Sequence, residues 1–202
     1  MLRPHFAQIR PLKVEHYPPG EAPTEFEPGD FILVHGHSFF SRLIRFGERL
    51  RVHGDDRQYT YWNHAALIAT AEGGLVEATG RGVQRTHLSD YTPMDCQLVR
   101  IDASDADRAE VVAFAEWAAD ARDPYDWLTI ASITLSVLTG SKLAFFVDGE
   151  FICSGLVARA LERTTATFNL DPVHITPADL AKYYGVPGHS AQVHRAVQEA
   201  QA

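Results

Sequence analysis

Residues 62–78 read WNHAALIATAEGGLVEA. It contains two short apolar runs, at residues 64–69 and 75–78, on either side of the turn residues Glu72-Gly73-Gly74. Apolar runs of this length around a glycine-rich turn predict two antiparallel strands joined as a β-hairpin. We therefore expect these two strands to lie side by side within the central sheet of the protein.

Each predicted strand carries one ionisable side chain, because His64 opens the first strand and Glu77 interrupts the second. A two-residue turn would place Glu77 opposite His64, and a four-residue turn would place it opposite Ala66. Both turns put the two side chains on one face, whereas a three- or five-residue turn would separate them. On one face, the carboxylate can orient the imidazole as the third member of a triad does. The alternatives are a strand-end histidine in water and a solvent-facing glutamate.

A candidate nucleophile lies far downstream, at Cys153. The segment FICSGLV at residues 151–157 leads into apolar residues at helical spacing, which puts the thiol at or near the first turn of a helix. Unpaired amide groups at a helix start favour an anion, so they lower the pKa of a thiol. The alternative is a buried, inert cysteine. We expect the only other cysteine, Cys96, to be a passive core thiol.

Further strands and helices are predicted on both sides of the hairpin. Residues 31–35 follow a Pro-Gly-Asp turn and predict a strand, and residues 97–101 predict another. Residues 104–119 predict a helix with a serine cap, and TPAD at residues 176–179 opens a short helix. Strands in the first half and helices mostly in the second indicate an α+β fold, with a central antiparallel sheet packed against helices.

Composition excludes several classes of protein. The 202 residues are 46% hydrophobic with a net charge of −8, which indicates one globular domain or at most two small ones and no nucleic-acid partner. Two cysteines exclude a disulfide-rich scaffold. The N-terminus has no apolar run typical of a signal peptide, and the most apolar window, residues 127–146, is too polar for a membrane helix. We expect that window to be a buried helix and the protein to be cytoplasmic.

The order of the motifs resembles that of a known family. The motifs are Gly29-Asp30 with a strand, the hairpin with His64 and Glu77, Cys153-Ser154-Gly155, and TPAD at residues 176–179. This order is similar to that of the circularly permuted papain-like hydrolases of the NlpC type, the YiiX/YaeF group, whose permuted plan lecithin:retinol acyltransferase shares. The resemblance implies a permuted papain-like fold, in which the cysteine follows the histidine along the chain.

By this resemblance Cys153 is the nucleophile, His64 the base and Glu77 the orienting residue of a cysteine hydrolase or acyltransferase that needs no cofactor. The bond attacked is an amide or an ester, in a small molecule, a peptide or an acyl lipid. The alternative is a non-catalytic binding or structural module that retains the fold. We expect an N-terminal arm at residues 1–27, a catalytic domain at residues 28–187 and a polar tail at residues 188–202.

Four residues are candidates for the substrate side. Tyr61 and Trp62 precede the histidine and are expected to line a substrate cleft, unless they only pack. His35 begins a loop, residues 35–38, that is expected to form one wall of the cleft. It is also part of a His-Gly-His motif without a third ligand at a defined spacing, so we expect no metal there. Residues 38–51 predict a helix whose arginines, including Arg42, would meet an anionic substrate group or a lipid phosphate at a membrane surface. The alternative for this helix is a scaffold role.

Overall fold

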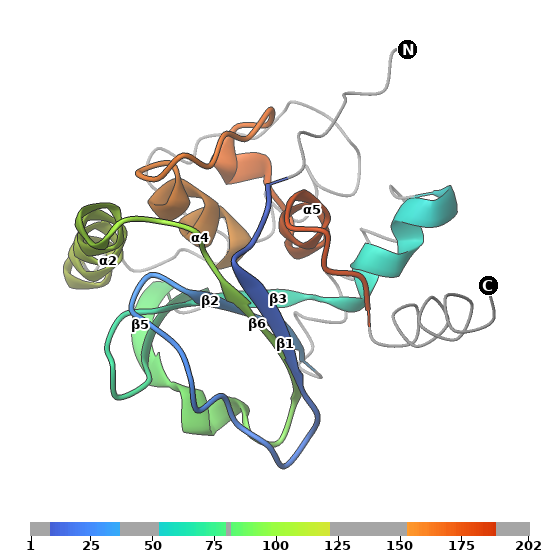
Figure 1. The fold of residues 1–202 in the computed structure, drawn as a ribbon, viewed down its shortest axis with the longest axis horizontal. Coiled ribbons are helices and arrows are strands. Elements are labelled where there is room, and N and C mark those ends of the chain that lie inside the picture. The colour runs from blue at the N-terminus through green and yellow to red at the C-terminus, as the bar shows by residue number, and fades with distance from the viewer. Residues whose placement is uncertain (1–8, 37–52, 80–81, 122–152, 189–202) are drawn as a thin grey trace.

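The computed structural model describes residues 9–36, 53–79, 82–121 and 153–188 (Figure 1). Over these residues the chain is α+β. A six-stranded antiparallel sheet has the strand order β1-β6-β2-β3-β4-β5. Figure 1 shows the helices α2, α4 and α5 on one side of this sheet. The expected α+β class with a central antiparallel sheet against helices is confirmed.

The strands are β1 (Lys13–Tyr17), β2 (Phe31–His35), β3 (His64–Ile68), β4 (Gly74–Thr79), β5 (Gly82–His87) and β6 (Asp95–Arg100). The α-helices are α2 (Asp105–Asp120), α4 (Cys153–Leu161) and α5 (Pro177–Tyr183). Short 3₁₀ helices are η1 (Gly54–Tyr61), η2 (Leu88–Tyr91) and η3 (Pro172–His174). The expected helix at residues 38–51 and the apolar window at residues 127–146 lie outside the described residues. In the described parts, no helix is long and apolar enough to span a bilayer.

The N-terminal arm contributes a strand that we did not predict. Residues 13–17 form β1 and pair with β6 at the edge of the sheet, with Val14 opposite Val99. The side chains of β1 are exposed or only partly buried. An edge strand with little burial lacks the apolar alternation that identifies a strand in a sequence, so the arm gave no periodic signal.

The hairpin of β3 and β4 has the register of the four-residue turn. Leu67 pairs with Val76 and Ile68 with Leu75. The amide of Ala69 donates to the Gly74 carbonyl at 2.8 Å, which closes the turn. The predicted hairpin is therefore confirmed, and this register puts His64 and Glu77 on the same face as diagonal neighbours.

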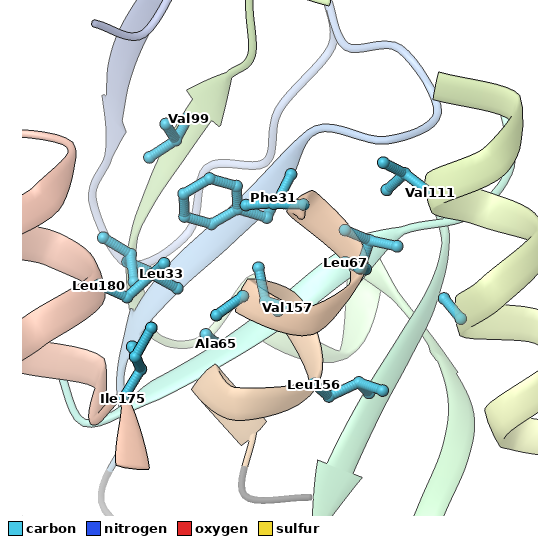
Figure 2. Packing of buried hydrophobic residues seen from close by; sticks show 14 of the residues in the cluster. Phe31, Leu33, Ala65, Leu67, Val99, Val111, Leu156, Val157, Ile175 and Leu180 are labelled. Carbon is cyan, nitrogen blue, oxygen red and sulfur yellow. The ribbon is translucent and has the colours of Figure 1, made fainter. Parts of the chain in front are cut away.

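The two faces of the sheet bury different clusters. Figure 2 shows the helix-covered face, where Phe31, Leu33 and Leu67 pack against Leu156 and Val157 of α4. The opposite face buries alternate residues of the same strands together with side chains of η2; these are Ile32, Val34, Ala66, Ile68, Leu75, Leu88, Tyr91, Cys96 and Leu98. Because side chains alternate along a strand, the helix face and the opposite face are both fixed by the register.

The Gly29-Asp30 motif attaches α2 to the sheet. The fully buried Asp30 carboxylate accepts from Arg108 at 2.9 Å and from the amide of Ile101 at 3.0 Å. Gly29 has a φ of 94°, and a Cβ there would lie 3.3 Å from the Arg108 side chain. The start of α2 is capped by Ser104, which accepts from the Asp107 amide, as the sequence predicted.

Candidate active site

Cys153 is the first residue of α4, where the sequence predicted the thiol. The helix is held in place because nearly all of its side chains are buried, and the fully buried Leu156 and Val157 pack on the sheet. The Ser154 hydroxyl is also buried and donates to the Ile175 carbonyl at 2.6 Å. These contacts fix the position of the thiol, which is itself only 5% exposed.

The thiol of Cys153 contacts β3 at a point where β3 is no longer paired with β4. At the end of β3, the amide of Ile68 donates to the backbone carbonyl of Asp30, on the β2 side. The next amide, that of Ala69, donates to the carbonyl of Gly74, on the β4 side. Because amides alternate in direction along a strand, the amide of Ala65 also points to the β4 side. The paired residues of β3 in this ladder are only Leu67 and Ile68. The Ala65 amide is therefore left to hydrogen-bond the sulfur of Cys153.

His64 connects the thiol to Glu77. Its Nε2 hydrogen-bonds Oε2 of Glu77 and lies 3.1 Å from the Tyr91 hydroxyl. The His64 side chain also hydrogen-bonds Cys153. An imidazole has two nitrogens, so with Nε2 bound to Glu77 the other nitrogen, Nδ1, is the one that serves the sulfur. The three predicted catalytic residues are thus brought together in one hydrogen-bonded line.

Burial and charge act in opposite directions on this line. Burial alone lowers the pKa of His64, but the charges and hydrogen bonds of Cys153 and Glu77 outweigh it and raise that pKa to about 10. Burial alone raises the pKa of Cys153, but His64 and the amides of Ala65 and Ser154 outweigh it and lower that pKa below its ordinary value. These directions favour a thiolate beside an imidazolium over two neutral groups.

Glu77 is a buried carboxylate, so the alternative of a solvent-facing glutamate is wrong. It is 3% exposed and belongs to the face of the sheet opposite the helices. Burial alone raises its pKa, but the hydrogen bonds and charge of His64 and the hydroxyl of Tyr91 outweigh burial and lower it. Tyr91 donates to the same oxygen, Oε2, that binds His64. Sequence reasoning missed Tyr91, because no spacing rule links a tyrosine in a 3₁₀ turn to the hairpin before it.

Two of the predicted substrate-side residues belong to a polar cluster that consists of His16, His35, Tyr61 and Asp95. The rings of His35 and Tyr61 stack with centroids 4.1 Å apart, and His35 Nδ1 donates to the Tyr61 carbonyl at 2.7 Å. The Tyr61 hydroxyl donates to Asp95, which also binds Nε2 of His16 at 2.5 Å. This polar cluster lies at the sheet end where β2 ends and β3 begins, which is also the end that holds His64.

The expectation that Trp62 lines a substrate cleft is wrong. Its side chain is fully buried in the helix-side core, and its indole nitrogen donates to the Val186 carbonyl at 3.0 Å. The ordinary-packing alternative therefore holds for Trp62. Arg42 and the second histidine of the His-Gly-His motif, His37, lie outside the described residues. Among the described residues, no group of three or more histidine, cysteine or acidic side chains is arranged to hold a metal ion.

Cys96 is buried in the opposite face of the sheet and is a free thiol, like Cys153. Burial and the neighbouring charge of Asp95 raise its pKa to about 11. The two cysteines therefore differ in their environment: one faces a base and amide donors, and the other faces apolar side chains. As predicted, Cys96 is a core thiol, and its burial and raised pKa make it an internal reference for Cys153.

No model of a known protein family matches the chain, and no curated protein matches its sequence. A thiol, a base in hydrogen-bond contact with it and a buried acid that orients the base are the components of nucleophilic catalysis. The arrangement can supply an anionic sulfur and return a proton to a leaving group.

Proposed function

We propose that the protein is a cysteine hydrolase or acyltransferase that attacks amide or ester bonds through Cys153, His64 and Glu77. One observation carries the proposal: a hydrogen-bonded line runs from the thiol through the imidazole to a buried carboxylate. A structural cysteine needs no base, and a structural histidine needs no buried acid behind it. The opposite pKa directions of Cys153 and His64 support the same interpretation.

The reaction proceeds in two steps. The thiolate of Cys153 attacks the carbonyl carbon, and His64 donates its proton to the leaving amine or alcohol as the carbon–heteroatom bond breaks. The product of this step is a thioester on Cys153. Water, or an acceptor alcohol or amine, then attacks the thioester while His64 takes its proton, and the thiolate is released with the acid or the transferred acyl product. The backbone amide of Cys153, at the start of α4, is the candidate donor to the oxyanion.

The finer fold assignment, a permuted papain-like fold of the NlpC type, belongs to this proposal. Its support is the combination of a cysteine at the start of a helix, α4, and a histidine and an acid on the adjacent strands β3 and β4 of an antiparallel sheet. The cysteine follows the histidine by 89 residues. Triads depend on spatial geometry and not on chain order, so this order is compatible with papain-like chemistry.

The substrate side of the proposal rests on the polar cluster. By alternation along β2 and β6, His35 and Asp95 lie on the helix-covered face, the face that carries Cys153. The partly exposed side chains of His35 and Tyr61, stacked on each other, are the proposed contacts for a peptide or small-molecule substrate. An acyl lipid would in addition place its anionic phosphate against the arginines around Arg42 at a membrane surface.

The test is covalent labelling with an acyl-electrophile probe, followed by mass mapping of the labelled residue. We expect label on Cys153 and none on Cys96, and loss of label in His64→Ala. Cys96→Ala is the matched control and should label like the wild type. Equal labelling of both cysteines, or labelling of Cys153 that does not depend on His64, would leave the non-catalytic module as the function. A substrate screen with and without an acceptor amine or alcohol then separates hydrolysis from transfer.

A further inference from the structure

We infer that Tyr91 is a positioning residue that keeps Glu77 ionised and directed at His64, and thereby extends the proposed activity toward acidic pH. The inference rests on the proposed function, because it gives Tyr91 a part in the same line of residues. It goes beyond that function, because nothing in the roles of nucleophile, base and orienting acid requires a phenol.

Tyr91 contacts both the acid and the base. Its hydroxyl donates to Oε2 of Glu77, the oxygen that also binds Nε2 of His64. The same hydroxyl lies 3.1 Å from Nε2, and the two rings are nearly parallel at 15° with centroids 5.9 Å apart. Contact with one partner would be ordinary packing. Contact of one hydroxyl with the shared oxygen and the shared nitrogen places Tyr91 where it can govern the proton between them.

The position of Tyr91 is fixed by its own turn. It ends η2, whose N-terminus has a capping box: His87 accepts from the Ser89 amide, and Asp90 accepts from the His87 amide at 3.1 Å. The Tyr91 ring packs in the cluster on the sheet face opposite the helices. A capped turn and a buried ring leave the hydroxyl little freedom, so the hydrogen bond to Glu77 is built into the fold.

Few groups compete for the Glu77 carboxylate. His64 faces it from β3 and Tyr91 faces it from η2, whereas the Cys153 sulfur of α4 contacts His64. From β5, the Thr86 hydroxyl faces the carboxylate and also acts to lower its pKa, although it lies outside hydrogen-bond geometry; Asp90, next to Tyr91, is exposed. Thus two donors, the imidazole and the phenol, hold a carboxylate in an apolar setting. Loss of either donor leaves the charge less compensated, and burial then favours the protonated acid.

The phenol is suited to this task because its proton is not lost in the working range. Burial and the charge of Glu77 raise the pKa of Tyr91 above its ordinary value, so the hydroxyl stays a donor. A donor to a carboxylate lowers its proton affinity. Removal of the hydroxyl should therefore make Glu77 more basic, so that it takes a proton at a higher pH and no longer orients His64 in mild acid.

The test is titration of the Glu77 carboxyl by ¹³C NMR in the Cys153→Ala background, which removes the coupled thiol and does not require turnover. Glu77→Gln assigns the resonance. Tyr91→Phe keeps the ring and removes only the donor, and it should raise the Glu77 pKa by about one unit, the effect of one hydrogen bond to a charge. In the protein that keeps Cys153, Tyr91→Phe should also move the acid limb of the pH profile for probe hydrolysis to higher pH.

Tyr183→Phe is the matched control, because the Tyr183 phenol is buried too but donates to Asn169, away from Glu77. It should leave the Glu77 titration unchanged. Replacement of Tyr91 by 3-fluorotyrosine should shift the Glu77 pKa in the opposite direction, to a lower value, because the fluorinated phenol is a stronger donor. An unshifted Glu77 in both Tyr91 variants would overturn the inference. Failure of the proposed function is a separate result, because it would appear as an unreactive Cys153 while the carboxyl titration still responded to Tyr91.

Discussion

Replacement of Glu77 by Gln removes one negative charge from the buried line and keeps the shape of the side chain. In the wild type, Oε2 of Glu77 accepts from His64 and from Tyr91. The amide oxygen of Gln can accept the same two bonds, but without charge. A hydrogen bond to a charged group is worth about 1.5–3 kcal/mol, and about 1.4 kcal/mol corresponds to one pKa unit. The pKa of His64, raised to about 10, should therefore fall by about one to two units.

Two readouts follow from that shift. The alkaline limb of the pH–rate profile reports loss of the His64 proton that the leaving group needs, so it should move to lower pH by about one to two units. Turnover at neutral pH should fall by about 10- to 100-fold, less than the roughly 10⁴-fold loss in serine triads, because a thiolate–imidazolium pair needs less help. Glu116→Gln changes a charge paired with Arg85 at the surface and should alter neither readout.

The assay is probe hydrolysis as a function of pH, together with NMR titration of the His64 ring. An alkaline limb and turnover equal to those of the wild type would refute the role of Glu77 and leave it as a buried structural acid. A loss of folding would be recognised by the thermal midpoint, which should change little, because the Gln side chain can keep both hydrogen bonds.

Three other perturbations test the scaffold and the substrate side. Trp62→Phe should lower the free energy of unfolding by about 1–3 kcal/mol, because packing and the hydrogen bond to the Val186 carbonyl are lost, while Cys153 labelling is retained. A variant of unchanged stability with weaker substrate binding would restore the interpretation that Trp62 lines a cleft. Asp30→Ala removes the buried carboxylate from Arg108, which keeps only the half-exposed Glu27 at 3.4 Å as an acidic partner. Denaturant titration should show a loss of about 3–5 kcal/mol, whereas a loss below about 1 kcal/mol would contradict the buried ion pair. Asp95→Asn should raise the KM of a peptide or ester substrate by about 3- to 10-fold at unchanged kcat, because Tyr61 loses a charged acceptor; an unchanged KM would separate the polar cluster from the substrate.

The hairpin and its two polar residues could be predicted because strand periodicity is local. Two apolar runs and a glycine turn limit the register. Whether the turn has an even or an odd number of residues then decides whether His64 and Glu77 share a face. The position of Cys153 could be predicted for a similar reason, since helical spacing begins directly after it. These features depend on neighbours in the sequence, and the structure bears them out.

The features that sequence did not predict depend on contacts across the fold. The contact of the Ala65 amide with the sulfur arises where the β3–β4 ladder ends, and no residue type marks that point. Tyr91 reaches Glu77 from a turn that follows another strand. Trp62 was expected at a cleft because it stands near His64, but its indole points into the core, and the direction of an aromatic side chain depends on tertiary packing.

The most direct test of the central claim is the rate of Cys153 alkylation by iodoacetamide as a function of pH, measured residue by residue by mass spectrometry in the wild type and in His64→Ala. We expect Cys153 in the wild type to react at pH values well below the ordinary thiol pKa of about 8.5. We expect this reactivity to move up toward the ordinary value in His64→Ala, while Cys96 stays slow in both proteins. A single rise near the ordinary thiol pKa in both proteins would show that Cys153 is an inert core thiol and would contradict the account.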